Sequence, residues 1–289
     1  MAKCTDSMLF PGGKKRALTL SYDDGVRQDR RLVEILNHFG LKATFNINAG
    51  LLSREEELVI NGKSVDVSKI AHEEVSALYR GHEVAAHGLW HSSLTDIAAS
   101  AAMFELTEDK HLLERITGKL VRSFAYPFGT FSDEVKEMLR LAGFESARTV
   151  ISTGEFTIPR DFLAWEATCH HSDPALMELA RRFCCEEALF GRSQLFYLWG
   201  HAYEFDADDN WSVIEDFARY MAGYADRIWF VTNGDFRDYV NSYRQLRVSA
   251  DGRIVYNPTA AELWMEIHEA PARIGPGETV SLRDTNYEF

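Results

Sequence analysis

Short apolar stretches typical of strands alternate with amphipathic helical patterns along most of this chain of 289 residues. Strand patterns at 17–21 and 42–47 flank a helical pattern at 30–39, whose apolar residues recur every three or four positions. Further strand patterns lie at 83–86, 121–125, 146–150, 162–165, 195–199 and 228–231. Further helical patterns lie at 71–79, 95–116, 134–142, 175–183, 211–221 and 234–243. Such alternation with short connections predicts an α/β fold with parallel neighbouring strands.

The pattern changes near residue 246. Four strand patterns follow there without intervening helices, at 246–249, 253–256, 263–267 and 279–282. We therefore expect a main domain over 1–245 and a small β-rich C-terminal appendage over 246–289. The polar segment 51–69 is expected to lie outside the main layers.

Composition excludes several classes of partner. The formal net charge of −13 and the absence of a basic stripe disfavour nucleic acid and anionic membranes. No apolar run is long enough for an export signal or a membrane span, which predicts a cytoplasmic protein. The four cysteines have no CxxC spacing, so we expect reduced thiols.

Two adjacent carboxylates, Asp23 and Asp24, follow the first strand directly. Two like charges side by side are costly to bury, so such a pair indicates a metal site or an acid/base site. The alternative is a solvated turn in which Gly25 supplies a positive φ. The surrounding stretch alone does not decide between these interpretations.

Other strand ends also carry residues suited to chemistry. His87 and His91 follow the strand at 83–86 with a spacing common in metal sites, although many such pairs are ordinary surface or core residues. His201 follows the strand at 195–199. Residues 126–129, Tyr-Pro-Phe-Gly, end another strand and can direct a backbone N–H into a cavity, or form a plain turn.

The carboxyl ends of the strands in a (β/α) barrel converge on one rim, so this placement predicts a distorted barrel of about seven strands with its site at that rim. One Asp and two His would form a facial metal site with open positions, and the second Asp would remain as a base. A divalent metal acidifies water towards a pKa of ~7, which suits hydrolysis of an amide or ester. A histidine such as His201 could then protonate the leaving group.

Four motifs in this order, SYDDG, HGLWH, FAYPFG and LFYLWGH, resemble those of the polysaccharide deacetylase family, also called NodB-like or carbohydrate esterase family 4. The resemblance runs from about Ala17 to Tyr239 and implies a NodB-like barrel. It further implies that a divalent metal is bound, zinc first, with cobalt, manganese or nickel as alternatives. The metal ligands implied by position are Asp24, His87 and His91.

The resemblance also implies that Asp23 is the general base and that His201 is the general acid. The backbone N–H of Phe128 would complete an oxyanion hole, and we expect Tyr126, Pro127 and Trp165 to contribute to the oxyanion or substrate site. These assignments follow the family motifs position by position.

The chain departs from the family pattern in two motifs. An arginine that pairs with the base is replaced by Ala125, so we expect either that Arg122 or another cation compensates or that the base is tuned differently. The family's Asp that orients the acid histidine has no clear counterpart, since Trp165 is followed by Glu166. His170 and His171 form an unexplained pair, for which we favour a plain loop over a substrate-binding role.

Three functions agree with the sequence. The first is a metal-dependent hydrolase that removes acetyl groups from an N-acetyl amino sugar or an O-acetylated carbohydrate. The second is an allantoinase-like amidohydrolase acting on another small amide or ureide. The third is an inactive carbohydrate-binding relative, which the complete set of catalytic residues disfavours. In each case the partner is a small carbohydrate or amide, and the sequence carries no signal for an oligomeric state.

Overall fold

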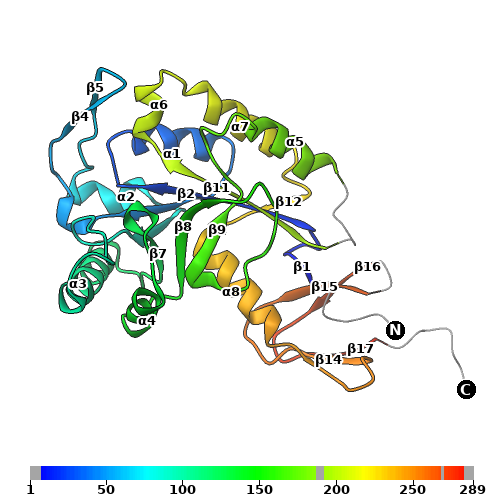
Figure 1. Ribbon diagram of the computed structural model, residues 1–289. Coiled ribbons are helices and arrows are strands. Elements are labelled where there is room, and N and C mark those ends of the chain that lie inside the picture. The colour runs from blue at the N-terminus through cyan, green and yellow to red at the C-terminus, as the bar shows by residue number, and fades with distance from the viewer. Residues whose placement is uncertain (1–7, 187–191, 268–269, 283–289) are drawn as a thin grey trace, which may run out of the picture.

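A nearly closed parallel sheet forms the centre of the molecule in the computed structural model, which describes residues 8–186, 192–267 and 270–282 (Figure 1). The strands run in the order β10-β11-β2-β3-β6-β7-β8-β9, and β12 pairs with β2 beside this path. Their bounds are β2 (Arg16–Asp23), β3 (Thr44–Ile47), β6 (Glu83–Ala86), β7 (Ser123–Ala125), β8 (Ser146–Ser152), β9 (Trp165–Ala167), β10 (Cys169–His170), β11 (Gln194–His201) and β12 (Ile228–Phe230). All of these strands pair in parallel, which confirms the predicted distorted (β/α) barrel.

Helices cover the outside of this sheet (Figure 1). Their bounds are α1 (Asp29–His38), α2 (Val75–Leu78), α3 (Ala99–Thr117), α4 (Asp133–Leu141), α5 (Leu176–Cys185), α6 (Tyr203–Ala207), α7 (Ser212–Ala222) and α8 (Asn233–Arg244). In α1 the buried side chains include Leu32, Val33 and Leu36, which share one face at helical spacing. Burying each such aliphatic side chain contributes about 1.5–3 kcal/mol to folding, so packing on the sheet stabilises the helix.

Two stretches differ from their predicted structure. The predicted strand 162–165 is a 3-10 turn (Phe162–Ala164) that leads into β9, because Asp161 caps the turn by accepting from the N–H of Leu163. The predicted helix 71–79 is a 3-10 turn (His72–Glu74) followed by the short α2. The polar segment 51–69 contains an antiparallel hairpin of β4 (Glu57–Ile60) and β5 (Lys63–Asp66).

The C-terminal strands form two small antiparallel sheets (Figure 1). One joins β13 (Arg247–Val248), β14 (Ile254–Tyr256) and β17 (Thr279–Ser281), and the other joins β1 (Met8–Leu9), β15 (Leu263–Ile267) and β16 (Ala270–Ile274). Strand β16 is absent from the sequence prediction. Because β1 belongs to this second sheet, a strand from the beginning of the chain contributes to the β-rich part. The boundary near residue 246 stays a prediction.

Within the described part of the chain, no helix combines the length and apolar character needed to cross a membrane. Cys169 and Cys184 are buried free thiols and Cys185 is an exposed one, as expected for these three. Cys4 lies outside the described residues.

Candidate active site

Four neighbouring strands, in the order β11-β2-β3-β6, carry the central residues of the site at their carboxyl ends. Asp23 is the last residue of β2, and its register partners are Asn46 of β3 and His201 of β11. Asp24 follows β2 directly, and His87 follows β6, the next strand beyond β3. Since parallel strands end at the same edge of a sheet, residues far apart in the sequence converge here.

The backbone is strained at three residues of this rim. Asp24, His91 and Phe128 have φ values of 80°, 59° and 58°, in the left-handed region that side chains other than glycine seldom adopt. Such conformations cost on the order of 1–3 kcal/mol each and cluster at functional sites, where the surrounding structure imposes them. This concentration of strain supports a functional site at the rim.

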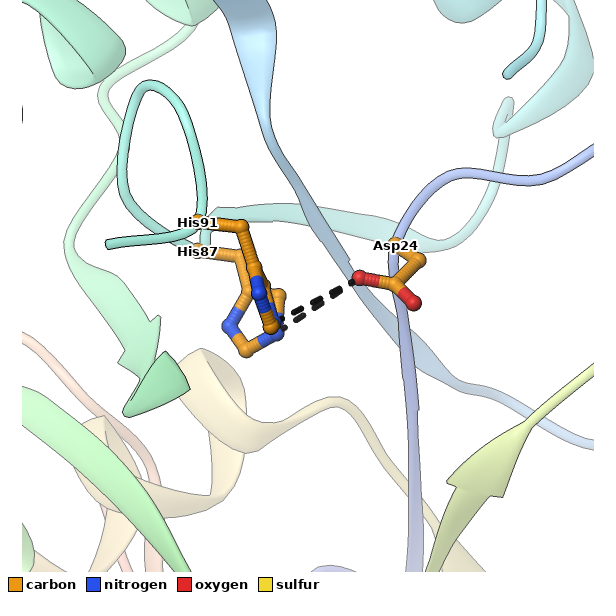
Figure 2. A group of neighbouring side chains, drawn as sticks. All are labelled: Asp24, His87 and His91. Atoms are coloured by element: carbon orange, nitrogen blue, oxygen red, sulfur yellow. Dashed lines mark ion pairs between the residues drawn. The ribbon is translucent and has the colours of Figure 1, made fainter. Parts of the chain in front are cut away.

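Asp24, His87 and His91 form a compact group of possible metal ligands. Oδ1 of Asp24 lies 3.8 Å from Nε2 of His87 and 3.8 Å from Nε2 of His91. Figure 2 shows both imidazoles directed towards the Asp24 carboxylate from a separate loop. The two histidines lie on a loop, since residues 87–91 do not form a helical turn.

Buried acceptors hold this histidine loop in place. Asp109 of α3 accepts from the N–H of His87 (2.9 Å), and Glu105 one helical turn earlier accepts from the N–H of Trp90 (3.0 Å). Asn48 donates to the carbonyl of His87 (2.7 Å). These bonds fix the backbone of the loop and therefore the direction of its imidazoles.

The donor set fits a divalent transition metal. Nδ1 of His87 lies 2.8 Å from the carbonyl of Ala125, which places its proton there and leaves Nε2 free to face the Asp24 carboxylate. Burial lowers the pKa of His87 to about 4, so the imidazole is neutral, as a metal ligand must be. Burial also lowers the pKa of His91. Two neutral imidazoles and one carboxylate are ligands that zinc and related ions prefer.

Asp23 is almost completely buried and is paired with a buried arginine. Its Oδ2 accepts from Nη2 of Arg148 in β8, and its Oδ1 accepts from Nδ2 of Asn46 (2.8 Å). Burial by itself would raise the pKa of Asp23, but Arg148, His87 and His201 outweigh it and lower the pKa to about 2. Asp23 is therefore an ionised carboxylate at neutral pH.

Arg148 makes the contact with Asp23 that the sequence led us to expect from a compensating cation. Ala125, which occupies the family position in β7, is the register partner of Arg148 in the adjacent β8. The guanidinium also stacks 4.4 Å from the ring centroid of Trp199. Arg122 instead pairs with Asp238 (2.7 Å), so its expected compensating role is wrong.

His201 lies between two carboxylates. Its Nε2 is 3.9 Å from Oδ2 of Asp23, and its Nδ1 is 3.3 Å from Oε1 of Glu204 in α6. Burial by itself would lower the pKa of His201, but Glu204 and Asp23 outweigh burial and raise the pKa to about 9. His201 is therefore an imidazolium at neutral pH and can act as a proton donor.

Lys69 brings a further positive charge to the site. Its Nζ lies 3.8 Å from Oδ1 of Asp24, and its side chain is 8% exposed. The lysine follows the hairpin segment and forms a backbone bridge with Val26. Burial would raise the pKa of Asp24, but Lys69 and the nearby histidines lower it overall.

The four residues expected at the oxyanion or substrate site lie in different surroundings. The Phe128 ring is 64% exposed and packs edge-on against the His91 ring with centroids 4.5 Å apart. Pro127 and Tyr126 are buried, and the Tyr126 hydroxyl donates to the carbonyl of Leu163 (2.7 Å). Trp165 is 1% exposed and packs among core aromatic rings. The structure thus brings Phe128 to the rim, while Trp165 and Tyr126 face the interior.

Sequence reasoning missed Arg148, Lys69 and Glu204. Arg148 interrupts a strand pattern that is otherwise small and apolar, and a charge there indicates a buried partner. Glu204 follows His201 by three residues, a spacing that allows the two side chains to meet at a strand end. Glu166, which follows Trp165 where the family pattern has the orienting Asp, is exposed in β9. Lys69 carries no signal in the local pattern.

The sequence model of the family described as polysaccharide deacetylase matches residues 11–147. This segment contains the metal-ligand candidates and Asp23, whereas Arg148 and His201 lie beyond it. A search of curated protein sequences found no match.

Solved structures share the fold. A Mycobacterium smegmatis protein assigned as a polysaccharide deacetylase aligns with a TM-score of 0.57 at 15% identity, over 82% of this chain and 94% of that one. A family 4 carbohydrate esterase from Streptomyces lividans aligns with a TM-score of 0.48 at 15% identity, over 75% and 92%. The carbohydrate esterase domain of a xylanase from the hindgut metagenome of Trinervitermes trinervoides aligns at 0.49 and 15% identity, over 78% and 92%. The first comparison carries the fold assignment. The matched segment, just under half of the chain, makes the sequence similar to polysaccharide deacetylases, and the first structural comparison shows the same fold.

Proposed function

We propose that this protein is a metal-dependent deacetylase that acts on an N-acetylated amino sugar or an O-acetylated carbohydrate. One observation carries the proposal: Oδ2 of Asp23 lies 3.8 Å from Nε2 of His87 and 3.9 Å from Nε2 of His201. A candidate base, a candidate acid and a candidate metal-ligand group therefore surround one small space. Metal-assisted hydrolysis of an amide or ester uses these three groups together.

Asp24, His87 and His91 would hold the ion. Zinc is our first candidate because a set of two imidazoles and one carboxylate with open positions suits it, with cobalt, manganese and nickel as alternatives. When bound, a divalent ion acidifies water and polarises a carbonyl oxygen.

The chain's own residues would move the protons. Asp23 is ionised and accepts a proton from the attacking water, while Arg148 keeps the carboxylate in place. The N–H of Phe128 would donate to the oxygen that becomes negative at the acyl carbon. His201 would release the proton on Nε2 to the leaving nitrogen or oxygen as its bond to the acyl carbon breaks and that atom takes the electron pair.

Metal removal and reconstitution test this function. The purified protein is treated with a chelator, dialysed and supplied with Zn²⁺, Co²⁺, Mn²⁺ or Ni²⁺, and acetate release is then measured on chitin oligomers and acetylated xylan fragments. We expect about one ion per chain and acetate release that depends on it. Ammonia from allantoin or other small amides without acetate release would favour the amidohydrolase. No turnover with any of these metals or substrates would favour the binding protein.

A further inference from the structure

A second cluster of two histidines and one carboxylate lies beside the proposed acid. Oε2 of Glu204 lies 3.2 Å from Nε2 of His170 and 3.1 Å from Nε2 of His171. His170 is the last residue of β10, and His171 follows it directly. Strand β10 pairs with β11, which ends at His201. The previously unexplained histidine pair is thus part of the surroundings of His201.

The two oxygens of Glu204 have different partners. Oε2 accepts from the backbone N–H of His201 (3.1 Å) and faces the His170 and His171 imidazoles. Oε1 lies 3.3 Å from Nδ1 of His201. One oxygen therefore anchors the carboxylate, and the other lies within ion-pair distance of Nδ1 of His201, which has no hydrogen bond within the described residues.

Two histidines and one carboxylate are also a possible set of metal ligands. The hydrogen-bond partners of the ring nitrogens that face away from Glu204 argue against a metal in this cluster. Nδ1 of His170 accepts from the N–H of Ser172 (3.2 Å) and lies 2.7 Å from the Ser172 hydroxyl. Because the backbone N–H can only donate, the proton of a neutral His170 lies on Nε2 and faces Glu204. Histidines that bind a metal almost always donate their other N–H to an acceptor. Nδ1 of His171 is buried without a hydrogen-bond partner in the described part of the chain.

The position of His171 is imposed by close packing. A Cβ on Gly200 would lie 2.1 Å from Nδ1 of His171, so glycine at that position lets the ring approach the backbone of β11. The ring also stacks on Phe205 with centroids 4.2 Å apart. His171 is therefore rigidly placed to hold Glu204.

We propose that Glu204, anchored by His170 and His171, is the positioning residue that orients His201 and holds the proton on its Nδ1, so that Nε2 faces the reacting group as proton donor. This inference rests on the proposed function for the identity of the reaction. The geometry that carries it, two carboxylates on opposite sides of one imidazole, is independent of the substrate. The raised pKa of His201, to about 9, agrees with this arrangement.

The groups facing His201 come from several elements. They are Asp23 of β2 and Asp24 directly after it, Glu204 and the Tyr203 ring of α6, the His170 ring of β10 and the Trp199 ring of β11. Of these, Glu204 is the carboxylate that faces Nδ1. Its removal should therefore change the protonation of His201 without touching the metal-ligand group.

The closing experiment compares Glu204→Gln with Glu204→Asp and with Glu166→Gln, a matched control at an exposed position. Imidazole ¹⁵N NMR of the metal-free proteins follows the tautomer and titration of His201 and needs no turnover. In the wild type and the control, we expect an imidazolium that persists to about pH 9. In Glu204→Gln we expect its pKa to fall by at least about one unit, and Glu204→Asp should restore part of that fall.

A second readout uses leaving groups. Glu204→Gln should lower kcat on an alkyl acetate by about 10–100-fold, with a much smaller effect on 4-nitrophenyl acetate, whose leaving group departs without a proton. A purely structural role would lower both rates equally. An unchanged His201 titration in Glu204→Gln would overturn the proposal, as would a second metal ion per chain that is lost in this variant. If no ester is hydrolysed, the proposed function fails while the NMR result still decides the role of Glu204.

Discussion

Two clusters in this molecule have the same composition, two histidines and one carboxylate, and different geometry. In Asp24, His87 and His91 the carboxylate oxygen lies 3.8 Å from each facing nitrogen, beyond hydrogen-bond distance. In the cluster of Glu204 with His170 and His171 the corresponding distances are 3.2 Å and 3.1 Å. Both separations are compatible with ligands around one ion, since ligands at zinc bond lengths lie about 3.3 Å apart, so the distances alone do not separate the two groups.

The difference teaches that ligand chemistry alone does not define a metal site. The outer nitrogen of His87 is held by the carbonyl of Ala125, which directs its other nitrogen at a ligand. The outer nitrogen of His170 accepts from a backbone N–H instead. Partners on the far side of the imidazole thus separate a candidate metal centre from a positioning cluster.

The largest expected effect that distinguishes the two clusters is metal loss in Asp24→Asn. Removing a ligand carboxylate should reduce the metal content from about one ion per chain to near zero and abolish acetate release. Elemental analysis of purified protein measures this. Glu204→Gln serves as the comparison and should keep its metal. Equal metal content in the two variants would contradict the assignment.

Asp23→Asn should separate base from ligand within the first cluster. It is expected to keep its metal and to lose turnover by about 10²–10⁴-fold, because the attacking water no longer has a proton acceptor. Metal content and kcat are measured on the same sample. Near-normal turnover, or metal loss as complete as in Asp24→Asn, would place the base elsewhere.

Arg148→Gln tests the support of the base rather than the ligands. It leaves the buried Asp23 carboxylate without its guanidinium, which should cost about 3–5 kcal/mol in the free energy of unfolding. Denaturant titration of the metal-free protein measures this. Arg122→Gln is the matched control: its side chain and that of its partner Asp238 are 34% and 44% exposed, so we expect a loss below about 1 kcal/mol. Similar losses in both variants would refute the role given to Arg148.

Lys69→Met should have the smallest effect and should act in the opposite direction. Removing a positive charge 3.8 Å from Oδ1 of Asp24 should tighten metal binding, by roughly three- to tenfold, because a unit charge at that distance is worth about 1 kcal/mol in a water-like dielectric. Competition with a chromophoric chelator measures the dissociation constant. Lys63→Met, at the exposed pair with Asp209, should leave it unchanged. Weaker binding in Lys69→Met would show that the lysine supports the site.

Much of the fold followed from local patterns. Strand and helix patterns depend on the periodicity of apolar residues, so the succession of strands and helices along the chain was predictable. The same patterns placed Asp23, His87 and His201 at strand ends. The failures lie where a local interaction or a distant partner decides. A side-chain cap turns 162–164 into a 3-10 helix, and β16 pairs with a strand whose own partner, β1, begins the described chain.

The sequence by itself determined the fold class and which residues could serve as ligands, base and acid, because these depend on residue type and on position along a strand. The tertiary structure decided which charged residues support them. Arg148 reaches Asp23 because β8 lies beside β7 in register with Ala125, and Glu204 rather than Glu166 faces His201 because α6 turns back over the end of β11. The pairing of Arg148 with Asp23 joins distant segments through space, and spacing along the chain does not encode the distance between such side chains.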